Sequence, residues 1–337
     1  MHQLPRTALA IVAGGLLLAA CGSTAPAPAT LDGVASVSVS VPLSAVGCTT
    51  NDTCYAVGTT GVDTTVTTAA QYNVKGGAWH ALVAPSAPYG TLTTSSCWRD
   101  GCLFGGSGPT GGDLVWSVTG TSHLTTVSAP TNGAGVTDIS CYGEGTCAVL
   151  DVSGTGVARL STTADAGASW DAPRVLTAAS IPFTATSLSC LSSLNCVVAV
   201  HLTSSNTSVV DITEDGGGSW TQTSSGAWSN IDDLHCAQSW CVARATPTTG
   251  ADAVVTSNTD GTSWSSPVTP NGHAVTNIAC AALHHCVAVQ STGVAVRSGS
   301  HWTSFQLHYV PGPLVSVSCG HRWCAAVSAQ SALSIPL

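Results

Sequence analysis

The residues best suited to chemistry are fourteen of the 15 cysteines, which fall into seven close pairs. The pairs are Cys48 with Cys54, Cys97 with Cys102, Cys141 with Cys147, Cys190 with Cys196, Cys236 with Cys241, Cys280 with Cys286, and Cys319 with Cys324. Close pairs of this kind form disulfides or bind zinc. A zinc site needs two pairs to converge, whereas a regular repeat holds successive pairs apart. We therefore predict seven local disulfides and no metal.

The pairs mark a repeat of about 45 residues, a period typical of propellers and solenoids. In each unit an apolar run ends at the first cysteine, a polar turn follows, and the second cysteine opens a run such as Cys286–Val289. A third run follows a turn rich in glycine, serine and threonine, and a fourth begins at a tryptophan, as in Trp302–Phe305. Four short strands repeated seven times predict an all-β, seven-bladed β-propeller with four-stranded antiparallel blades.

The last unit contains only three runs, Leu314–Cys319, Cys324–Ser328 and Ala332–Leu337. A strand-like segment, Gly33–Val41, precedes the first cysteine unit. We expect it to become the outermost strand of the seventh blade, because this protects an otherwise exposed sheet edge.

Three aspartates lie in the turns between the third and fourth runs: Asp165, Asp215 and Asp260. A carboxylate in such a turn can accept hydrogen bonds from backbone N–H groups, and the neighbouring glycines permit a positive φ. The tryptophan that follows can pack between blades. These aspartates are therefore predicted to be structural.

Composition limits the partners. Only 7% of the residues are charged, the net charge is −9, and Lys75 is the sole lysine, so no basic patch suits a nucleic acid. Hydrophobic residues make up 44% of the chain, which is enough to form a core. A folded domain with no nucleic-acid partner is expected.

The N-terminus predicts export. His2 and Arg6 precede an apolar run, Ala8–Ala20, that is short for a membrane span. The sequence Leu18-Ala19-Ala20-Cys21 resembles the lipobox of bacterial lipoproteins. That resemblance implies a signal peptide at residues 1–20 and lipidation of Cys21, which would anchor the protein on the outer face of the cytoplasmic membrane. The composition of residues 21–32, rich in Ser, Pro and Ala, predicts a flexible tether, and the repeat places the propeller at 33–337. In the alternative, the signal is an ordinary secretory one and Cys21 is incidental.

The turn sequences Thr163–Trp170 and Thr213–Trp220 resemble the Asp-box (BNR) repeats of sialidase-type propellers, and Ser257–Trp264 is a degenerate copy. Together with the repeated Ser-Cys phrase they look like exported actinobacterial propellers, a resemblance that identifies architecture rather than activity. The photosystem assembly factor family has similar blades, and that resemblance implies a binding scaffold.

A sialidase would require clustered arginines and a Tyr/Glu nucleophilic pair. The chain has two glutamates, Glu144 and Glu214, both in turns on the face opposite a sialidase active site. The arginines after the tether are dispersed, at Arg99, Arg159, Arg174, Arg244, Arg297 and Arg322. We therefore predict a non-enzymatic binding or assembly scaffold for a glycan or protein ligand, with no cofactor. The alternative is a sialidase-like glycoside hydrolase acting on extracellular glycans.

The face opposite the disulfide turns is the expected ligand face, since loops carry function. Its candidate residues are Asp63, Asp113, Asp151, Arg244, His273, Tyr89 and Tyr309. Each could equally be a solvated loop residue. The adjacent His284 and His285 lie in a disulfide turn and do not by themselves define a metal site.

Overall fold

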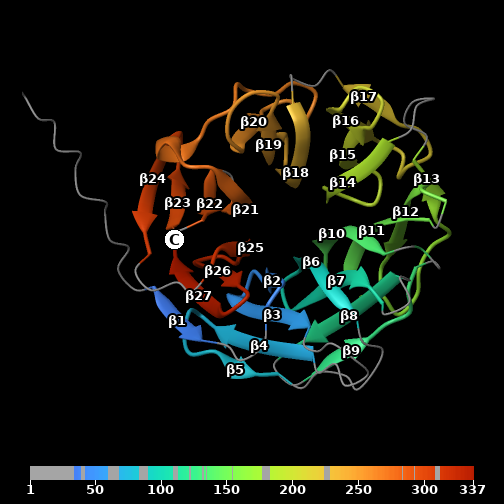
Figure 1. The fold of residues 1–337 in the computed structure, drawn as a ribbon. Coiled ribbons are helices and arrows are strands. Elements are labelled where there is room, and N and C mark those ends of the chain that lie inside the picture. The colour runs from blue at the N-terminus through green and yellow to red at the C-terminus, as the bar shows by residue number, and fades with distance from the viewer. Residues whose placement is uncertain are drawn as a thin grey trace, which may run out of the picture.

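The strands form seven sheets around a central axis (Figure 1), which confirms the predicted propeller. The computed structural model describes residues 34–38, 42–59, 68–82, 90–108, 113–120, 123–130, 133, 135–153, 155–176, 183–223, 228–282, 284–291, 293–307 and 312–337. Within these ranges no helix has the length and apolar character needed to cross a membrane. We number the blades 1 to 7 in chain order, starting with the sheet that contains β2.

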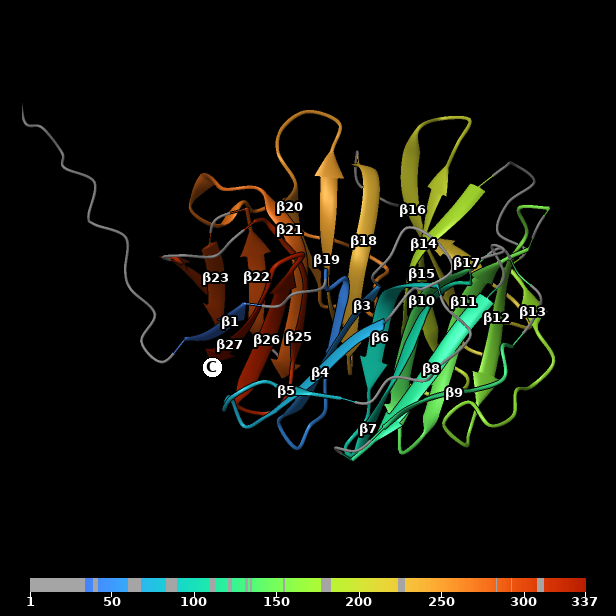
Figure 2. The ribbon, with the colours of Figure 1, turned by 60° about the horizontal axis from the view of Figure 1, so that its bottom comes forward.

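Figure 2 shows the strands of each blade running between the two faces of the ring. The innermost strands are β2 (Ala45–Cys48), β6 (Thr91–Cys97), β10 (Val136–Gly143), β14 (Phe183–Cys190), β18 (Trp228–Ala237), β21 (Val275–Ala282) and β25 (Leu314–Cys319). The second strands are β3 (Thr53–Thr59), β7 (Gly101–Ser107), β11 (Thr146–Val152), β15 (Cys196–Leu202), β19 (Trp240–Pro247), β22 (His285–Gln290) and β26 (Trp323–Ser328).

The outer half of each blade is shorter and more variable. The third strands are β4 (Thr68–Val74), β8 (Asp113–Thr119), β12 (Ala158–Thr163), β16 (Thr207–Thr213), β20 (Ala253–Ser257), β23 (Gly293–Ser298) and β27 (Ser331–Pro336). The outermost strands are β5 (His80–Ala81), β9 (Leu124–Thr126), β13 (Arg174–Val175), β17 (Thr221–Thr223), β24 (His301–Gln306) and, in blade 7, β1 (Ala35–Ser38).

Blade 5 departs from the prediction of four strands. Its sheet contains β18, β19 and β20 only, and a single bridge between Val254 and Val268 takes the place of the fourth strand. Pro267 precedes Val268 and has no N–H to give to a ladder, so regular pairing stops there. The short 3-10 helix η1 (Pro270–Gly272) then leads to blade 6.

The core is divided into seven clusters, one between each pair of neighbouring blades. Alternate residues of a strand face opposite sides, so Val198 and Val200 pack toward blade 3 whereas Val197 and Ala199 pack toward blade 5. Strands buried on both faces require near-continuous apolar runs, which explains the valine-rich second strand of each unit.

All seven predicted disulfides are present, each joining the inner strand of a blade to its second strand. The paired Cα atoms lie 3.9–4.1 Å apart, closer than the usual 5.5–6 Å. The cysteines are directly opposite each other, and in blade 1 the closing hydrogen bond from the Thr49 N–H to the Thr53 carbonyl lies just beyond them. They therefore occupy a non-hydrogen-bonded pair, the closer of the two antiparallel pair types.

The ring closes as predicted from the strand count. β1 pairs antiparallel with β27, from Ala35 opposite Ser334 to Ser38 opposite Ser331, and is the outermost strand of blade 7. The flanking residues of the predicted segment, 33 and 39–41, lie outside the described residues. Blade 7 also meets blade 1 directly, since the Cys48 N–H donates to Ser318 Oγ at 2.9 Å.

The aspartate turns of blades 3 and 4 are held by the same set of hydrogen bonds. Asp215 Oδ1 accepts from the Ser219 N–H at 2.8 Å and from Thr213 Oγ1 at 2.9 Å, while Asp215 Oδ2 accepts from Ser219 Oγ at 2.7 Å. These bonds, led by the one from the Ser219 N–H, lower the pKa of Asp215 to about 2. Asp165 makes the equivalent bonds to Ser169 and Thr163, which lower its pKa as well.

The turn of blade 5 corrects the assignment of Asp260. Thr259 occupies the aspartate position there, and its Oγ1 accepts from the Ser263 N–H at 2.9 Å. Asp260 is the next residue, at φ 53°, and its N–H donates to the Ser239 carbonyl at 3.0 Å. A motif match anchored on the aspartate beside Gly261 was therefore one residue out of register.

Candidate ligand-binding site in the central channel

Two rings of side chains line the channel. We define the proximal ring as the residues immediately before each first cysteine: Gly47, Ser96, Ser140, Ser189, His235, Ala279 and Ser318. The distal ring comprises the residues three before each first cysteine: Ala45, Thr94, Asp138, Ser187, Asp233, Asn277 and Ser316. All seven inner strands contribute to a cavity of about 120 Å³ on the axis. The distal ring lies nearer the face opposite the disulfide turns.

The serines of the proximal ring connect neighbouring blades. Ser140 Oγ accepts from the Cys190 N–H at 2.8 Å, and Ser189 Oγ accepts from the Cys236 N–H at 2.8 Å. Ser96 and Ser318 accept in the same way from the next blade. Gly47 replaces the serine in blade 1, where a Cβ would lie 2.5 Å from Cys97 Sγ. The repeated Ser-Cys phrase is thus explained by assembly of the ring.

Several residues of the distal ring also form hydrogen bonds between neighbouring blades. Asp138 accepts four hydrogen bonds, from Thr94 Oγ1 at 2.6 Å, the Ile139 N–H at 2.8 Å, Ser187 Oγ at 2.8 Å and the Leu188 N–H at 2.7 Å. These four donors fix the position of the carboxylate. Asp138 therefore joins blades 2, 3 and 4.

Blade 5 breaks this pattern because the bulge of its inner strand is displaced by one residue, from four to three residues before the first cysteine. In blade 3, Asp138 pairs with Leu150. Asp138 lies three residues before the first cysteine of the blade, and Leu150 lies three residues after the second. In blade 5 the partner at that level is Asp232, four residues before Cys236, and the register shifts between Asp232 and His235. Asp233 is the bulged residue, at φ 49°. The bulge places two adjacent aspartates at the channel wall.

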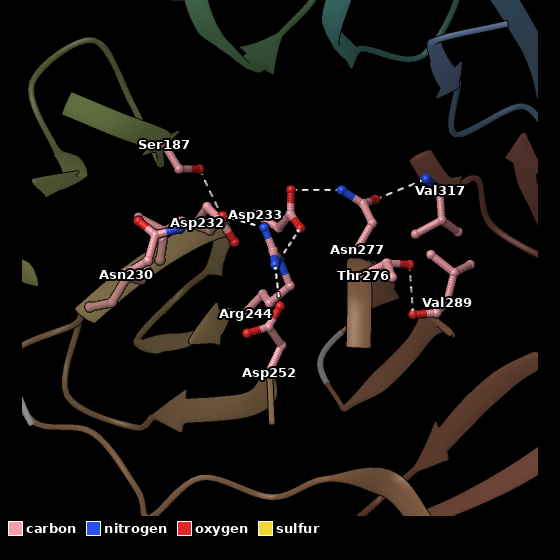
Figure 3. A network of polar contacts seen from close by, with 12 residues as sticks. Ser187, Asn230, Asp232, Asp233, Arg244, Asp252, Thr276, Asn277, Val289 and Val317 are labelled. Carbon is pink, nitrogen blue, oxygen red and sulfur yellow. Dashed lines mark hydrogen bonds and ion pairs between the residues drawn. The ribbon is translucent and has the colours of Figure 1, made fainter. Parts of the chain in front are cut away.

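Arg244 is the second departure from the repeat. It stands three residues after Cys241, where the other blades have buried Val57, Gly105, Leu150, Ala199, Val289 and Val327. Its guanidinium binds Asp232, Asp233 and Asp252, with Nε 3.3 Å from Asp233 Oδ2 and Nη1 2.9 Å from Asp252 Oδ2 (Figure 3). We call Asp232, Asp233, Asp252 and Arg244 the blade 5 cluster.

The cluster reaches across to blade 6. Asn277 Nδ2 donates to Asp233 Oδ1 at 2.6 Å, and Asn277 Oδ1 accepts from the Val317 N–H of blade 7 at 2.9 Å (Figure 3). Asn230 donates to Asp232 Oδ2 at 2.8 Å. A chain of polar contacts thus runs from blade 5 to blade 7 along the distal ring.

Three carboxylates around one guanidinium leave an excess of negative charge when all are ionised. Burial raises the pKa of Asp232, and burial followed by the charge of Asp232 raises the pKa of Asp233 well above its usual value. Burial opposes ionisation of Arg244 too, yet the three carboxylates raise its pKa overall. About a fifth of the side chains of Arg244, Asp232 and Asp233 remains exposed, so a ligand can reach them.

Of the predicted ligand-face residues that the structure describes in full, Arg244 is the one that belongs to this site. Asp151 is fully buried in an ion pair with Arg159 at 2.7 Å, so it is not part of an accessible face. His273 is exposed after η1, and its carbonyl accepts from Gln290 Nε2 at 3.4 Å. Asp63, Tyr89 and Tyr309 lie outside the described residues, and Asp113 begins β8 with its side chain outside them.

Sequence reasoning missed Asp138, Asp232, Asp233, Asp252 and Asn277. A signal was available in the repeat itself, because aligning the units on both cysteines places Arg244 in an otherwise uncharged column. Among the described residues, no group of three or more histidines, cysteines or acids is arranged to hold a metal ion.

These features define a class of protein: a seven-bladed β-propeller in which every blade carries an inner disulfide. No protein-family model matches the chain, and no curated protein sequence does either. Solved structures do match. YCF48 bound to D1 peptide has a TM-score of 0.62 at 11% identity, covering 92% of this chain and 99% of that one.

Two further structures have enzyme names. Virginiamycin B lyase from Staphylococcus aureus has a TM-score of 0.61 at 9% identity, covering 90% of this chain and 99% of the lyase. The GH74 xyloglucanase from Xanthomonas campestris has a TM-score of 0.57 at 12% identity, with 88% of this chain and 52% of the xyloglucanase covered. At these identities the similarity establishes the fold alone.

Proposed function

We propose that this propeller is a non-enzymatic binding scaffold whose ligand docks at the blade 5 cluster. The observation that carries the proposal is the departure of blade 5 from the sevenfold repeat. A displaced bulge, a charged residue in an otherwise uncharged column and Asp252 together place four ionisable groups at one point of the channel wall. Local rules of the fold require none of these changes, and such exceptions are expected at functional sites.

A protein segment suits this site better than a glycan. The axial cavity of about 120 Å³ is small beside the roughly 300–1,000 Å³ of typical ligand pockets, so it fits a single side chain. The three acidic side chains around the single arginine of the cluster and the net charge of −9 favour a basic segment, because a bound cation stabilises the ionised carboxylates. YCF48, of similar fold, has been solved with a peptide bound, which is consistent with peptide recognition by this architecture.

Binding can be tested with the oxidised full-length chain and an array of peptides in basic and charge-neutral versions. We expect basic peptides to bind, and Asp232→Asn/Asp252→Asn to weaken binding at least tenfold. The matched control is Glu214→Gln/Asp260→Asn, which removes two charges from the disulfide-turn face and should leave binding unchanged. Equal loss in both variants, or retention on a glycan array only, would reject this docking site.

Glycoside hydrolysis is the second candidate, and the raised pKa of Asp232 and Asp233 favours it because an acid catalyst must stay protonated near neutral pH. The geometry is less favourable. The carboxylates converge on Arg244 instead of facing each other across a sugar, and the arginine they neutralise cannot pair with a substrate carboxylate. Turnover of fluorogenic glycosides that disappears in Asp232→Asn would establish the enzyme.

We also propose that the protein is exported and held at the outer face of the cytoplasmic membrane by a lipid on Cys21. Seven disulfides support an oxidising compartment, whereas Cys21 lies outside the described residues. Cell fractionation is the test. Cys21→Ser should move the protein from the membrane to the soluble exported fraction, and a membrane-bound variant would contradict the anchor.

A further inference from the structure

Arg297 is a half-buried cation with no anionic partner among the described residues. It lies on β23, opposite Cys286 of β22 and Trp302 of β24, and faces blade 5. Its Nε and Nη1 atoms are buried and find no hydrogen-bond acceptor in the described part of the chain. Burial alone lowers its pKa, with no carboxylate opposing the effect. By contrast, Arg99, Arg159 and Arg244 each pair with an acid.

The described neighbours of Arg297 are aromatic rings, which stabilise its positive charge but do not neutralise it. Its Cζ lies 5.3 Å from the ring centroid of Trp240, which is only 4% exposed. His284 meets the same indole edge-on, with ring centroids 5.0 Å apart, and its buried Nδ1 has no partner within the described ranges. The indole stabilises a cation through its π face, but it cannot satisfy the N–H donors.

The aligned blades show that this arginine is not required by the turn. The equivalent positions are occupied by Asn73, Val118, Thr163, Thr213, Ser257 and Ile335, none of them charged. In blades 3, 4 and 5 the hydroxyl at this position accepts the N–H of the turn glycine. Blade 6 therefore exchanges a structural hydroxyl for a guanidinium, in a chain whose acids outnumber its basic residues.

We propose that Arg297, Trp240 and His284 form an oxyanion-binding site on the disulfide-turn face, between blades 5 and 6. The ligand group is a carboxylate or a phosphate. Its negative charge compensates the guanidinium, and its oxygens accept hydrogen bonds from the Arg297 N–H groups that have no acceptor within the described residues. A neighbouring cavity of about 120 Å³, lined by Trp240 and the disulfide turns of the two blades, gives room for the group that carries the anion. This site is separate from the blade 5 cluster, which faces the opposite end of the channel.

The test uses the oxidised full-length chain, labelled on its indole nitrogens and observed by NMR. The Trp240 signal is assigned by its loss in Trp240→Phe. Sodium acetate and sodium phosphate are then titrated separately against sodium chloride at constant ionic strength. We expect a saturable shift of the Trp240 signal with at least one oxyanion and none with chloride. A shift with acetate alone identifies a carboxylate ligand, and a shift with phosphate identifies a phosphate ligand.

Arg297→Gln should weaken oxyanion binding at least fivefold, whereas Arg322→Gln, which removes an exposed arginine of the blade 7 disulfide turn, should not. Thermal melting distinguishes a binding role from a packing role. Without oxyanion, Arg297→Gln should melt at or above the wild-type temperature, because it removes an unpaired cation. No saturable shift in the wild-type chain, or equal weakening in both variants, would overturn the proposal. Asp232→Asn/Asp252→Asn should leave this binding intact whatever its effect on the channel.

Discussion

Thr259 occupies in blade 5 the position that an aspartate occupies in blades 3 and 4. Comparing these turns shows what the aspartate contributes to the stability of the turn. The threonine hydroxyl accepts from the Ser263 N–H and lies 2.8 Å from Ser263 Oγ. A carboxylate has two oxygens for these donors and carries a charge that strengthens both bonds. The backbone at Thr259 already follows the turn, so an aspartate fits without rearrangement.

Thr259→Asp is therefore expected to raise the melting temperature by about 2 °C, since a charge-assisted hydrogen bond contributes about 1 kcal/mol net. Differential scanning calorimetry at pH 7 provides the measurement. Asp260→Asn is the control, because that side chain is not part of the turn network and asparagine tolerates the same positive φ. A lower melting temperature for Thr259→Asp would mean that the turn of blade 5 differs from the other two.

Asp211 on β16 is a fully buried carboxyl group whose two oxygens make no hydrogen bond of good geometry in the described structure. Desolvation raises its pKa to about 6, and the Gln222 amide opposite it counteracts this only in part. The folded pKa exceeds that of the unfolded chain, so the folded state binds the proton more tightly. Asp211 therefore costs no stability at low pH, and its cost grows as the pH rises from about 4 to 6.

Asp211→Asn should remove that cost, because the amide has nearly the same shape and no charge. We expect the variant to be more stable than the wild type by about 2 kcal/mol at pH 7 and equal to it near pH 4. Chemical denaturation at both pH values gives the difference. If the gain is the same at pH 4 and pH 7, ionisation of Asp211 is not its source.

At the level of elements, strand counting predicted the closing strand correctly but could not predict the irregular edge of blade 5. β1 was found because a three-strand unit leaves a sheet edge unpaired, and Gly33–Val41 was the strand-like segment available. The fourth strand is lost because of where Pro267 falls in the strand pairing. That position can be known only from the register of the strands, which the sequence does not provide. The displaced bulge in β18 was hidden in the same way, since a bulge preserves the apolar pattern around it.

Deleting residues 34–38 removes β1, with its four paired positions and the packing of Val34 against the core between blades 6 and 7. We expect the melting temperature to fall by about 4–8 °C, given about 2–4 kcal/mol for the lost ladder. Deletion of residues 24–28 from the predicted tether is the matched control. Analytical ultracentrifugation should also show self-association through the uncovered edge of β27. An unchanged melt would contradict the closure.

The whole molecule is held together by similar devices repeated around the ring. Each blade contributes a disulfide beside the channel, and serines bond four of the blades to the next through a cysteine N–H. Composition and cysteine spacing were sufficient to predict this architecture, because every unit repeats it. They could not predict the two proposed sites, because these consist of departures from the repeat and become visible only when the units are compared position by position.

Loss of one bridge, as in Cys190→Ala/Cys196→Ala, should lower stability by about 2 kcal/mol, because a loop this short gains little entropy when opened. Seven such contributions reach the same order as the net stability of a typical protein, about 5–15 kcal/mol. Complete reduction, verified by labelling of all fourteen thiols, should therefore unfold the ring at 37 °C, while the single-bridge variant stays folded. Circular dichroism and melting curves of both samples decide the matter. A reduced protein that keeps its native spectrum would show that interblade packing suffices and that the disulfides protect against some other stress.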